Sequence, residues 1–220
     1  MQITRILRSL TVAGLLLAAC GGDDDDGGDP TTTTAAIDDA AVAEELKGRL
    51  LALEDLQSED ALEARWAVGA VDEGVDIDLP ACVVEDPPPD ALGAAEATFV
   101  RQTQFKLPSL EEDLARYDDA VGAAAAFDAA VARLDGCTPE FVFEGASSTG
   151  TIERLDLALP GEQAAAWRTT VTIAQTPISI TTIHVQEGDL ELSLVHVDAA
   201  VPEAAVLQDY ATKALAALEG

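Results

Sequence analysis

The chain has 220 residues, with 41 acidic side chains against 12 lysines and arginines and a formal net charge of −29 at pH 7. Nucleic acids are bound through clusters of Lys and Arg that neutralise phosphates, so this balance argues against a nucleic-acid partner. The length suits one domain with its own core. The charge favours solubility and does not indicate a fold.

Residues 1–19 have the order of parts of an export signal. Met1–Ser9 carries Arg5 and Arg8 and no acid, and Leu10–Leu17 is apolar. This apolar run is too short to cross a bilayer as a helix, which takes about 20 residues. A positively charged segment followed by a short apolar segment predicts a signal peptide.

The signal ends at a cysteine. Leu17-Ala18-Ala19-Cys20 resembles the lipobox of bacterial lipoproteins, in which small residues precede an obligatory cysteine. The resemblance implies that the Cys20 thiol takes a diacylglyceryl group and that cleavage leaves Cys20 as the first residue. The alternative is an ordinary secretory peptide with a chance cysteine. We expect lipidation, which would anchor the protein on the extracytoplasmic face of the cell membrane.

Residues 20–35 are predicted to be a lipidated, acidic and flexible tether. Gly21–Thr34 contains five aspartates, four threonines, one proline and several glycines, and no large apolar residue. Such a segment cannot bury enough surface to offset its ordering entropy. A calcium loop is the alternative, but the spaced ligands and bidentate Glu of an EF-hand are missing. We therefore expect the folded domain to span 36–220.

Two helices and one strand are predicted in the first half of this domain. Apolar residues at helical spacing predict a helix over Ile37–Gln57. Asp78–Pro89 contains four prolines and is predicted to be a loop, and Ala97–Lys106 is predicted to be a strand. Asp118–Asp135 has a continuous apolar stripe and predicts a helix that ends at Gly136.

The second half is rich in β-strand signals. Apolar and polar residues alternate over five short runs, which predicts an antiparallel meander with one solvated face. A last amphipathic helix is predicted over Pro202–Leu218. The fold class is therefore α+β, with an antiparallel meander packed against N-terminal, central and C-terminal helices. The predicted strands are Phe141–Glu144, Ile152–Leu159, Trp167–Ala174, Ile178–Gln186 and Leu190–Val197.

The pairing of the last two strands can be predicted from their turn. Gly188-Asp189 fits a type II′ hairpin turn, with glycine first. Pairing across this turn places Ile183 opposite Leu194. Ile180 is out of phase with Ile183, so we expect a bulge near Thr181-Thr182.

Groups for catalysis are few. The only histidines are His184 and His196, and the predicted pairing sets them on opposite faces of the sheet, which argues against a shared metal site. His184 is expected to face away from the core and His196 to lie on the packed face. Gly145–Gly150 lacks the G-x-S-x-G spacing of a nucleophile elbow and is predicted to be a hairpin loop. We expect no enzyme, no metal site and no cofactor.

Cysteine usage agrees with export. If Cys20 is acylated, Cys82 and Cys137 remain, and an oxidising compartment would let them pair. The sequence alone does not show that their Cα atoms lie close enough for a bridge, so two buried free thiols are the alternative. We expect one disulfide between them.

Several short motifs occur in a characteristic order. They are Leu79-Pro80-Ala81-Cys82, Tyr117-Asp118-Asp119-Ala120, Leu134-Asp135-Gly136-Cys137-Thr138 and Trp167-Arg168-Thr169, followed by the closing helix. This order resembles the PknH-like extracellular sensor domain of actinobacteria, which occurs on receptor Ser/Thr kinases and on lipoproteins. The resemblance implies an α+β fold and a ligand-sensing role. It also implies a second disulfide in many members, which this chain lacks because no cysteine follows Cys137.

We therefore expect a lipid-anchored, non-catalytic sensor or ligand-binding module of the cell envelope. Its ligand would be a small molecule or an envelope component of unknown identity. Without a kinase domain, a signal would pass to a partner, such as a membrane protein. The alternative is a lipid or glycolipid carrier with an apolar cavity, which an excess of large apolar residues would favour. With 5 Phe and 2 Trp, that excess is not evident.

Overall fold

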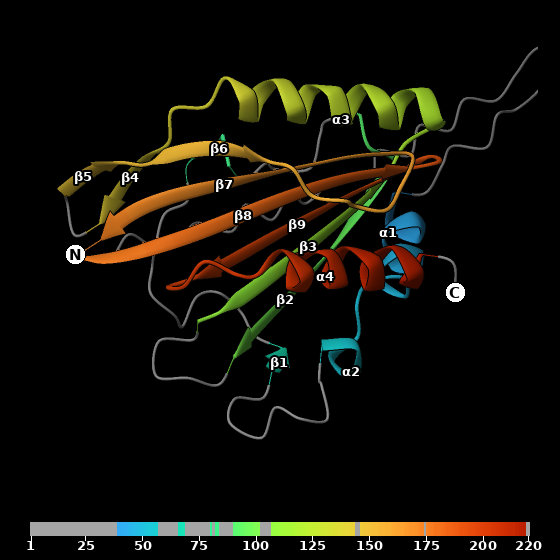
Figure 1. The fold of residues 1–220 in the computed structure, drawn as a ribbon. Helices are drawn as coiled ribbons and strands as arrows, with labels where there is room; N and C mark the ends of the chain where they lie inside the picture. Colours follow the sequence, from blue (N-terminus) through green and yellow to red (C-terminus); the bar gives the residue numbers. More distant parts are fainter. Residues whose placement is uncertain are drawn as a thin grey trace, which may run out of the picture. The chain divides into compact units, whose positions relative to one another are not determined.

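The main element of the computed structural model is a seven-stranded antiparallel sheet in the order β1-β2-β3-β9-β8-β7-β6 (Figure 1). The structure describes residues 39–56, 66–68, 80, 82–83, 90–101, 107–143, 146–173 and 175–218. The predicted signal, Cys20 and the tether lie outside this range. The strands are β1 (Trp66–Val68), β2 (Gly93–Arg101), β3 (Ser109–Arg116), β6 (Thr151–Leu155), β7 (Gln163–Ile173), β8 (Thr176–Glu187) and β9 (Leu190–Asp198).

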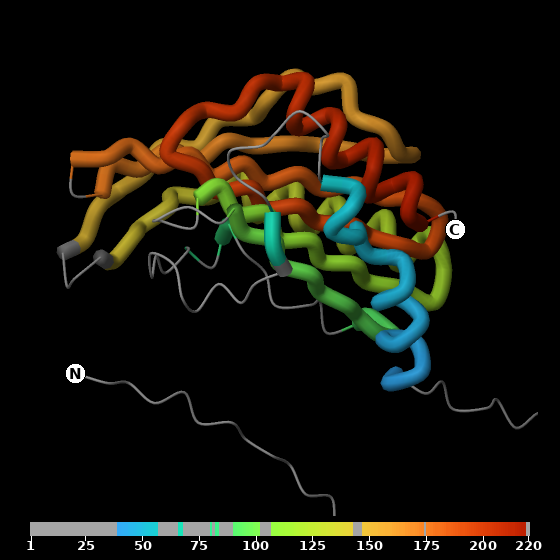
Figure 2. Tube along the Cα trace, turned by 90° about the horizontal axis from the view of Figure 1, so that it is seen from below, coloured from blue at the N-terminus to red at the C-terminus, as the bar shows by residue number. Residues whose placement is uncertain are grey.

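Helices lie on both faces of this sheet (Figures 1 and 2). Phe127 and Leu134 of α3 pack with Trp167 of β7 on one face, which we call the α3 face. Leu207 of α4 packs with Ile183 of β8 on the other, the α4 face. The remaining described elements complete the predicted α+β fold. They are α1 (Asp39–Lys47), α2 (Leu53–Leu56), α3 (Ala120–Asp135), α4 (Ala204–Ala217), and a two-stranded sheet of β4 (Glu140–Phe143) and β5 (Ala146–Thr149).

The hairpin of β8 and β9 has the predicted register. Gly188 takes a φ of 57°, which the first position of a type II′ turn requires, and Ile183 lies opposite Leu194. The predicted bulge is wrong, because pairing runs without interruption from Ser179 to Glu187. Ile180 and Ile183 are out of phase because each packs on a different face.

The prediction that one face of the sheet is solvated is wrong for β8. Every residue of β8 from Ile178 to Gln186 is buried. Since α3 covers one side and α4 the other, the central strands have no wet face. Side-chain alternation in this strand therefore separates two packed layers, and not core from solvent.

The predicted continuous helix Ile37–Gln57 is wrong, because the described chain forms α1 over Asp39–Lys47 and a separate short helix, α2, over Leu53–Leu56. The chain turns at Gly48, whose amide donates to the carbonyl of Glu45 at 3.1 Å. The Leu51 amide then donates to the buried side chain of Glu112 at 2.7 Å. The Leu51 amide, which would donate to a backbone carbonyl in a continuous helix, thus donates to a distant side chain.

The strand β3 lies where no element was predicted. Three consecutive acids, Glu111, Glu112 and Asp113, are residue types depleted in strands. Pairing with β2 on one side and β9 on the other overrides this preference. Leu110 and Leu114 are fully buried on the α4 face, with Glu112 between them on the same face, while Glu111 and Asp113 lie on the α3 face.

Candidate functional site

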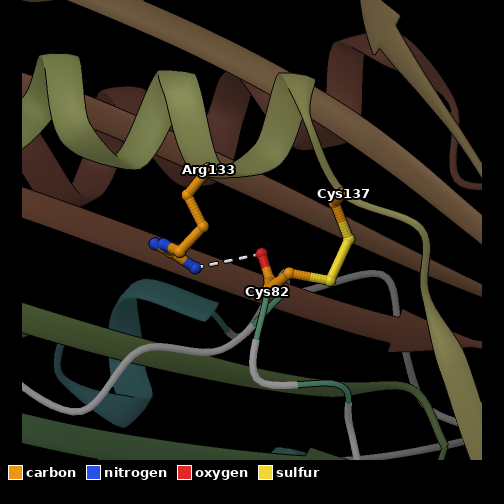
Figure 3. Close-up of a disulfide and its surroundings, with 3 residues drawn as sticks. All are labelled: Cys82, Arg133 and Cys137. Atoms are coloured by element: carbon orange, nitrogen blue, oxygen red, sulfur yellow. Dashed lines mark hydrogen bonds between the residues drawn. A yellow bond between two sulfur atoms is a disulfide. The ribbon is translucent and has the colours of Figure 1, made fainter.

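A disulfide joins Cys82 to Cys137, as predicted, with Cα atoms 5.7 Å apart. Cys137 follows Gly136, the C-cap of α3, and Arg133 Nη1 on that helix donates to the Cys82 carbonyl at 3.0 Å (Figure 3). Bridge and hydrogen bond together fix the C-terminal end of α3 to the segment that precedes β2. Their role is structural, since both cysteines pack against the apolar cluster around Phe141.

The two histidines lie on opposite faces, as predicted. His184 pairs with Ser193 on the α3 face, and His196 pairs with Thr181 on the α4 face. The expectation that His184 faces away from the core is wrong. Its side chain is buried, because α3 covers that side of the sheet.

His184 belongs to a buried hydrogen-bonded group on the α3 face, which we call the Glu191 network. Its Nδ1 lies 3.1 Å from Glu191 Oε1, and Tyr117 Oη donates to Glu191 Oε2 at 3.0 Å. The Trp167 ring meets the imidazole edge-on, with centroids 6.3 Å apart. Two partners thus hold the buried carboxylate of Glu191.

A histidine oriented by a carboxylate is also two thirds of a nucleophilic triad. The third member would have to bond His184 Nε2, and this atom has no hydrogen-bond partner among the described residues. Ser193 lies directly opposite on β9, but no bond joins it to the ring. The described residues of the Glu191 network therefore do not form a complete triad.

Acidic side chains gather beside this network on β2 and β3. Glu96 lies directly opposite Asp113, and Thr98 lies opposite Glu111. Burial, followed by the charges of Glu111, Glu96 and further carboxylates, raises the pKa of Asp113 to about 7. Like charges placed directly opposite destabilise a sheet. Within the described ranges, no three His, Cys, Asp or Glu side chains are placed to hold a metal.

Glu112 is the fully buried acid of the α4 face. Burial raises its pKa to about 7, although the hydrogen bond from the Leu51 amide opposes the shift. Its second oxygen, Oε1, has no hydrogen-bond partner among the described residues. This carboxyl joins the turn after α1 to the centre of the sheet.

Four polar side chains form a second cluster on the α4 face, which we call the polar strip: Ser179, Thr181, His196 and Arg168. Thr181 of β8 lies directly between His196 of β9 and Arg168 of β7. Ser179 follows on the same face of β8. Thr181 is 0% exposed, Ser179 3% and His196 4%. Directly opposed Cβ atoms lie about 5 Å apart, so the four groups are neighbours.

The polar strip is unusual in its hydrogen bonding. Ser179 Oγ, Thr181 Oγ1, His196 Nδ1 and Arg168 Nε are buried, and none has a hydrogen-bond partner in the described part of the chain. Each such group costs about 1–3 kcal/mol. Burial lowers the pKa of His196 to about 4, so its imidazole is neutral at pH 7. Four neighbouring unsatisfied groups are therefore able to donate or accept.

The sequence alone does not indicate this strip. Thr is common in strands, and the alternation of β8 predicted that one side would be wet. The signal that would have found it is the full burial of both faces, which is a property of the assembled layers.

The described residues include no helix with the length and apolar character of a membrane span. No protein-family model and no curated protein matches the chain. The fold is a seven-stranded antiparallel sheet between helices, with one disulfide and a buried polar cluster on each face. It is similar to the crystal structure of the extracellular domain of PknH from Mycobacterium tuberculosis, with a TM-score of 0.56 and 7% sequence identity. The match covers 80% of this chain and 94% of that chain, and at this identity it concerns the fold alone.

Proposed function

We propose that this protein is a lipid-anchored, non-catalytic sensor or ligand-binding module on the extracytoplasmic face of the cell membrane. The observation that supports the proposal is the fold, which resembles a domain described as the extracellular domain of PknH. The Cys82–Cys137 disulfide agrees with an oxidising compartment.

The buried polar strip on the α4 face is the site that we propose for binding. Its unsatisfied groups lie on three adjacent strands, β7, β8 and β9, so the sheet holds them in fixed relative positions. A buried polar group that has lost its hydrogen bond to water and gained no other is stabilised by any ligand that supplies the missing hydrogen bond. In the Glu191 network the carboxylate has two partners, and His184 Nε2 is the single unsatisfied atom among its described residues.

The anchor is tested by fractionating cells that express the full chain or Cys20→Ala. The wild type should be acylated and found in the membrane fraction, because two acyl chains hold a protein stably on a bilayer. The variant should appear in the soluble fraction or remain an uncleaved precursor. A cleaved variant that stays with the membrane would contradict the anchor.

The binding role is tested by native mass spectrometry of the full-length protein purified from its own envelope. We expect a non-covalent mass that is lost under denaturing conditions, besides the covalent lipid. Reproducible turnover in a hydrolase substrate panel, lost in His184→Ala with unchanged thermal unfolding, would contradict the non-catalytic proposal.

A further inference from the structure

The polar strip also indicates what kind of molecule it would bind. Two of its unsatisfied groups are hydroxyls, Ser179 Oγ and Thr181 Oγ1, and a third is Nδ1 of a neutral imidazole. A hydroxyl donates one hydrogen bond and accepts others, and a neutral imidazole has one nitrogen of each kind. Arg168 Nε adds a pure donor. The complementary ligand therefore carries groups that both donate and accept.

The charges around the strip are balanced. Arg168 lies in it, and Nη1 of this residue donates to Glu153 Oε1 at 3.3 Å on the neighbouring strand. Asp198 lies directly opposite Ser179, and both Asp198 and Arg101 act on the charge state of His196. Two arginines and two carboxylates thus lie around the strip, so their formal charges cancel and leave no excess charge for an ionic ligand to neutralise.

We propose that the polar strip binds a small, uncharged, polyhydroxylated molecule, a sugar or a polyol, through Ser179, Thr181, His196 and Arg168. This inference rests on the proposed binding function and names the ligand class of the same site. Sugar hydroxyls match side chains that need both donors and acceptors, and they bring no charge to a site that is already balanced.

An anionic ligand fits less well. The whole chain carries a net charge of −29, and a field of that sign lowers the concentration of anions at the surface. Asp198 would also repel an anion at the Ser179 end of the strip. A lipid tail fits least, because it has neither donor nor acceptor and would leave each buried hydroxyl without a hydrogen bond.

The ligand must reach the strip from its outer edge. Thr181 is fully covered, whereas the Arg168 side chain is 20% exposed and Thr170 and Asp198 are half-buried. The segment 199–203 joins β9 to α4 at this end of the sheet (Figure 1). We expect the ligand to displace side chains at this edge and to contact Ser179 before Thr181.

Saturation-transfer NMR on the full-length protein in detergent tests the inference. The probes are glycerol, myo-inositol, glucose and mannose, with inorganic phosphate and acetate as charged comparisons. We expect a signal from at least one uncharged probe and none from the anions. The matched pair of variants is Thr181→Val on the α4 face and Thr182→Val, which makes the same change on the buried opposite face of β8.

Thr181→Val and Arg168→Gln should abolish the signal of the uncharged probe or weaken its affinity by roughly tenfold or more, which corresponds to one or two hydrogen bonds. Thr182→Val should leave this signal unchanged. Without probe, Thr181→Val should keep or raise the melting temperature, because it removes an unsatisfied hydroxyl. Loss of signal would then not reflect unfolding.

Three results would overturn the inference. They are no signal from any uncharged probe, a stronger signal from phosphate or acetate, and an equal effect of both valine variants. The mass spectrometry described above keeps the proposed function separate. A retained anion or lipid there would leave the binding function standing while the sugar or polyol proposal fails, and the absence of any retained mass would count against the binding function itself.

Discussion

Glu112 shows how one buried carboxyl shapes both local structure and pH response. It accepts the Leu51 amide at 2.7 Å and so ends the helical path after α1. Burial raises its pKa to about 7, well above the ordinary value of 4.5. The folded state therefore holds this proton over a pH range in which the unfolded chain has released it. Because the folded state binds this proton more tightly than the unfolded chain, the free energy of unfolding falls as pH rises from about 4.5 to 7.

Glu112→Gln should remove this pH dependence. The amide still accepts from Leu51 and carries no charge to desolvate. At pH 8 we expect the variant to unfold with a free energy higher than wild type by up to about 3 kcal/mol, since one pKa unit corresponds to about 1.4 kcal/mol. Below pH 4.5 the two proteins should have similar stability. Urea unfolding at a series of pH values measures the difference.

Other groups with shifted pKa values also make stability depend on pH, so each variant must be compared with the wild type over the whole pH range. Among them, burial and the charge of Glu96 raise the pKa of Glu111. Asp113 also has a raised pKa and acts in the same direction as Glu112. The pKa of His196 is lowered to about 4, so its contribution to stability is lost as pH falls below 6.5 and opposes the carboxyls. Glu140→Gln makes the same change at an exposed position and should leave the pH profile as in wild type. An unchanged profile in Glu112→Gln would contradict the prediction.

Tyr117 is the donor whose loss should most directly test the Glu191 network. Tyr117→Phe removes the hydroxyl 3.0 Å from Glu191 Oε2, while the contact of His184 with the other carboxylate oxygen remains. We expect unfolding to become easier by about 1–3 kcal/mol. In a Glu191→Gln background the same substitution should cost measurably less. Strictly additive effects in this double-mutant cycle would show that the hydroxyl and the carboxyl are not coupled.

The disulfide is the strongest covalent constraint between described elements, because it joins the end of α3 to the segment before β2. It closes a loop with a sequence separation of 55 residues. Replacing both cysteines by alanine should lower stability by about 4 kcal/mol in the chain-entropy description. Thermal or urea unfolding of the Cys82→Ala/Cys137→Ala variant measures this loss.

Reductant provides the control for this variant. Dithiothreitol should lower the melting temperature of the wild type towards that of the double variant, and should leave the double variant unchanged. Thiol titration of unfolded, unreduced wild type should find neither Cys82 nor Cys137 free. Two titratable thiols in freshly prepared protein would contradict the bridge.

Elements built from local pairing could be predicted from the sequence. The hairpin of β8 and β9 follows from Gly188 and from alternation on either side of it, and the helix α3 follows from its apolar stripe and its stop at Gly136. Elements set by distant partners could not. The acids of β3 form a strand because β2 and β9 supply hydrogen bonds, and the break at Gly48 depends on Glu112, more than 60 residues away.

The candidate site was predictable to a smaller extent than the fold. The pairing of Cys82 with Cys137 and the opposite orientations of the two histidines were accessible from residue count and register. The polar strip was not, because the need of Thr181 for a partner arises only when α4 and the rest of the α4 face remove it from water. Both faces are buried because helices pack on each of them, and the alternation of residues within one strand does not indicate this packing.

Charge is the dominant property at the scale of the whole molecule. Acidic side chains outnumber lysines and arginines by 41 to 12. Most of the described cations are already paired, as Arg116 is with Glu45 and Lys213 with Asp209. Such exposed pairs contribute little. The remaining carboxylates repel one another, and this repulsion is stronger in the compact state than in the expanded unfolded chain.

Added salt should therefore stabilise the fold at neutral pH. Raising NaCl from about 0.01 M to 1 M shortens the Debye length from about 30 Å to 3 Å and removes most of the repulsion between separated charges. We expect the melting temperature to rise, by about 2–4 °C for each kcal/mol of repulsion relieved in a domain of this size. Scanning calorimetry at pH 8 over a series of NaCl concentrations measures the slope. Near the sequence pI of about 4.1, where the net charge vanishes, the same series should give a slope close to zero. A melting temperature that falls with salt at pH 8 would mean that ion pairs such as Arg116–Glu45 outweigh the excess of acid, against the charge count.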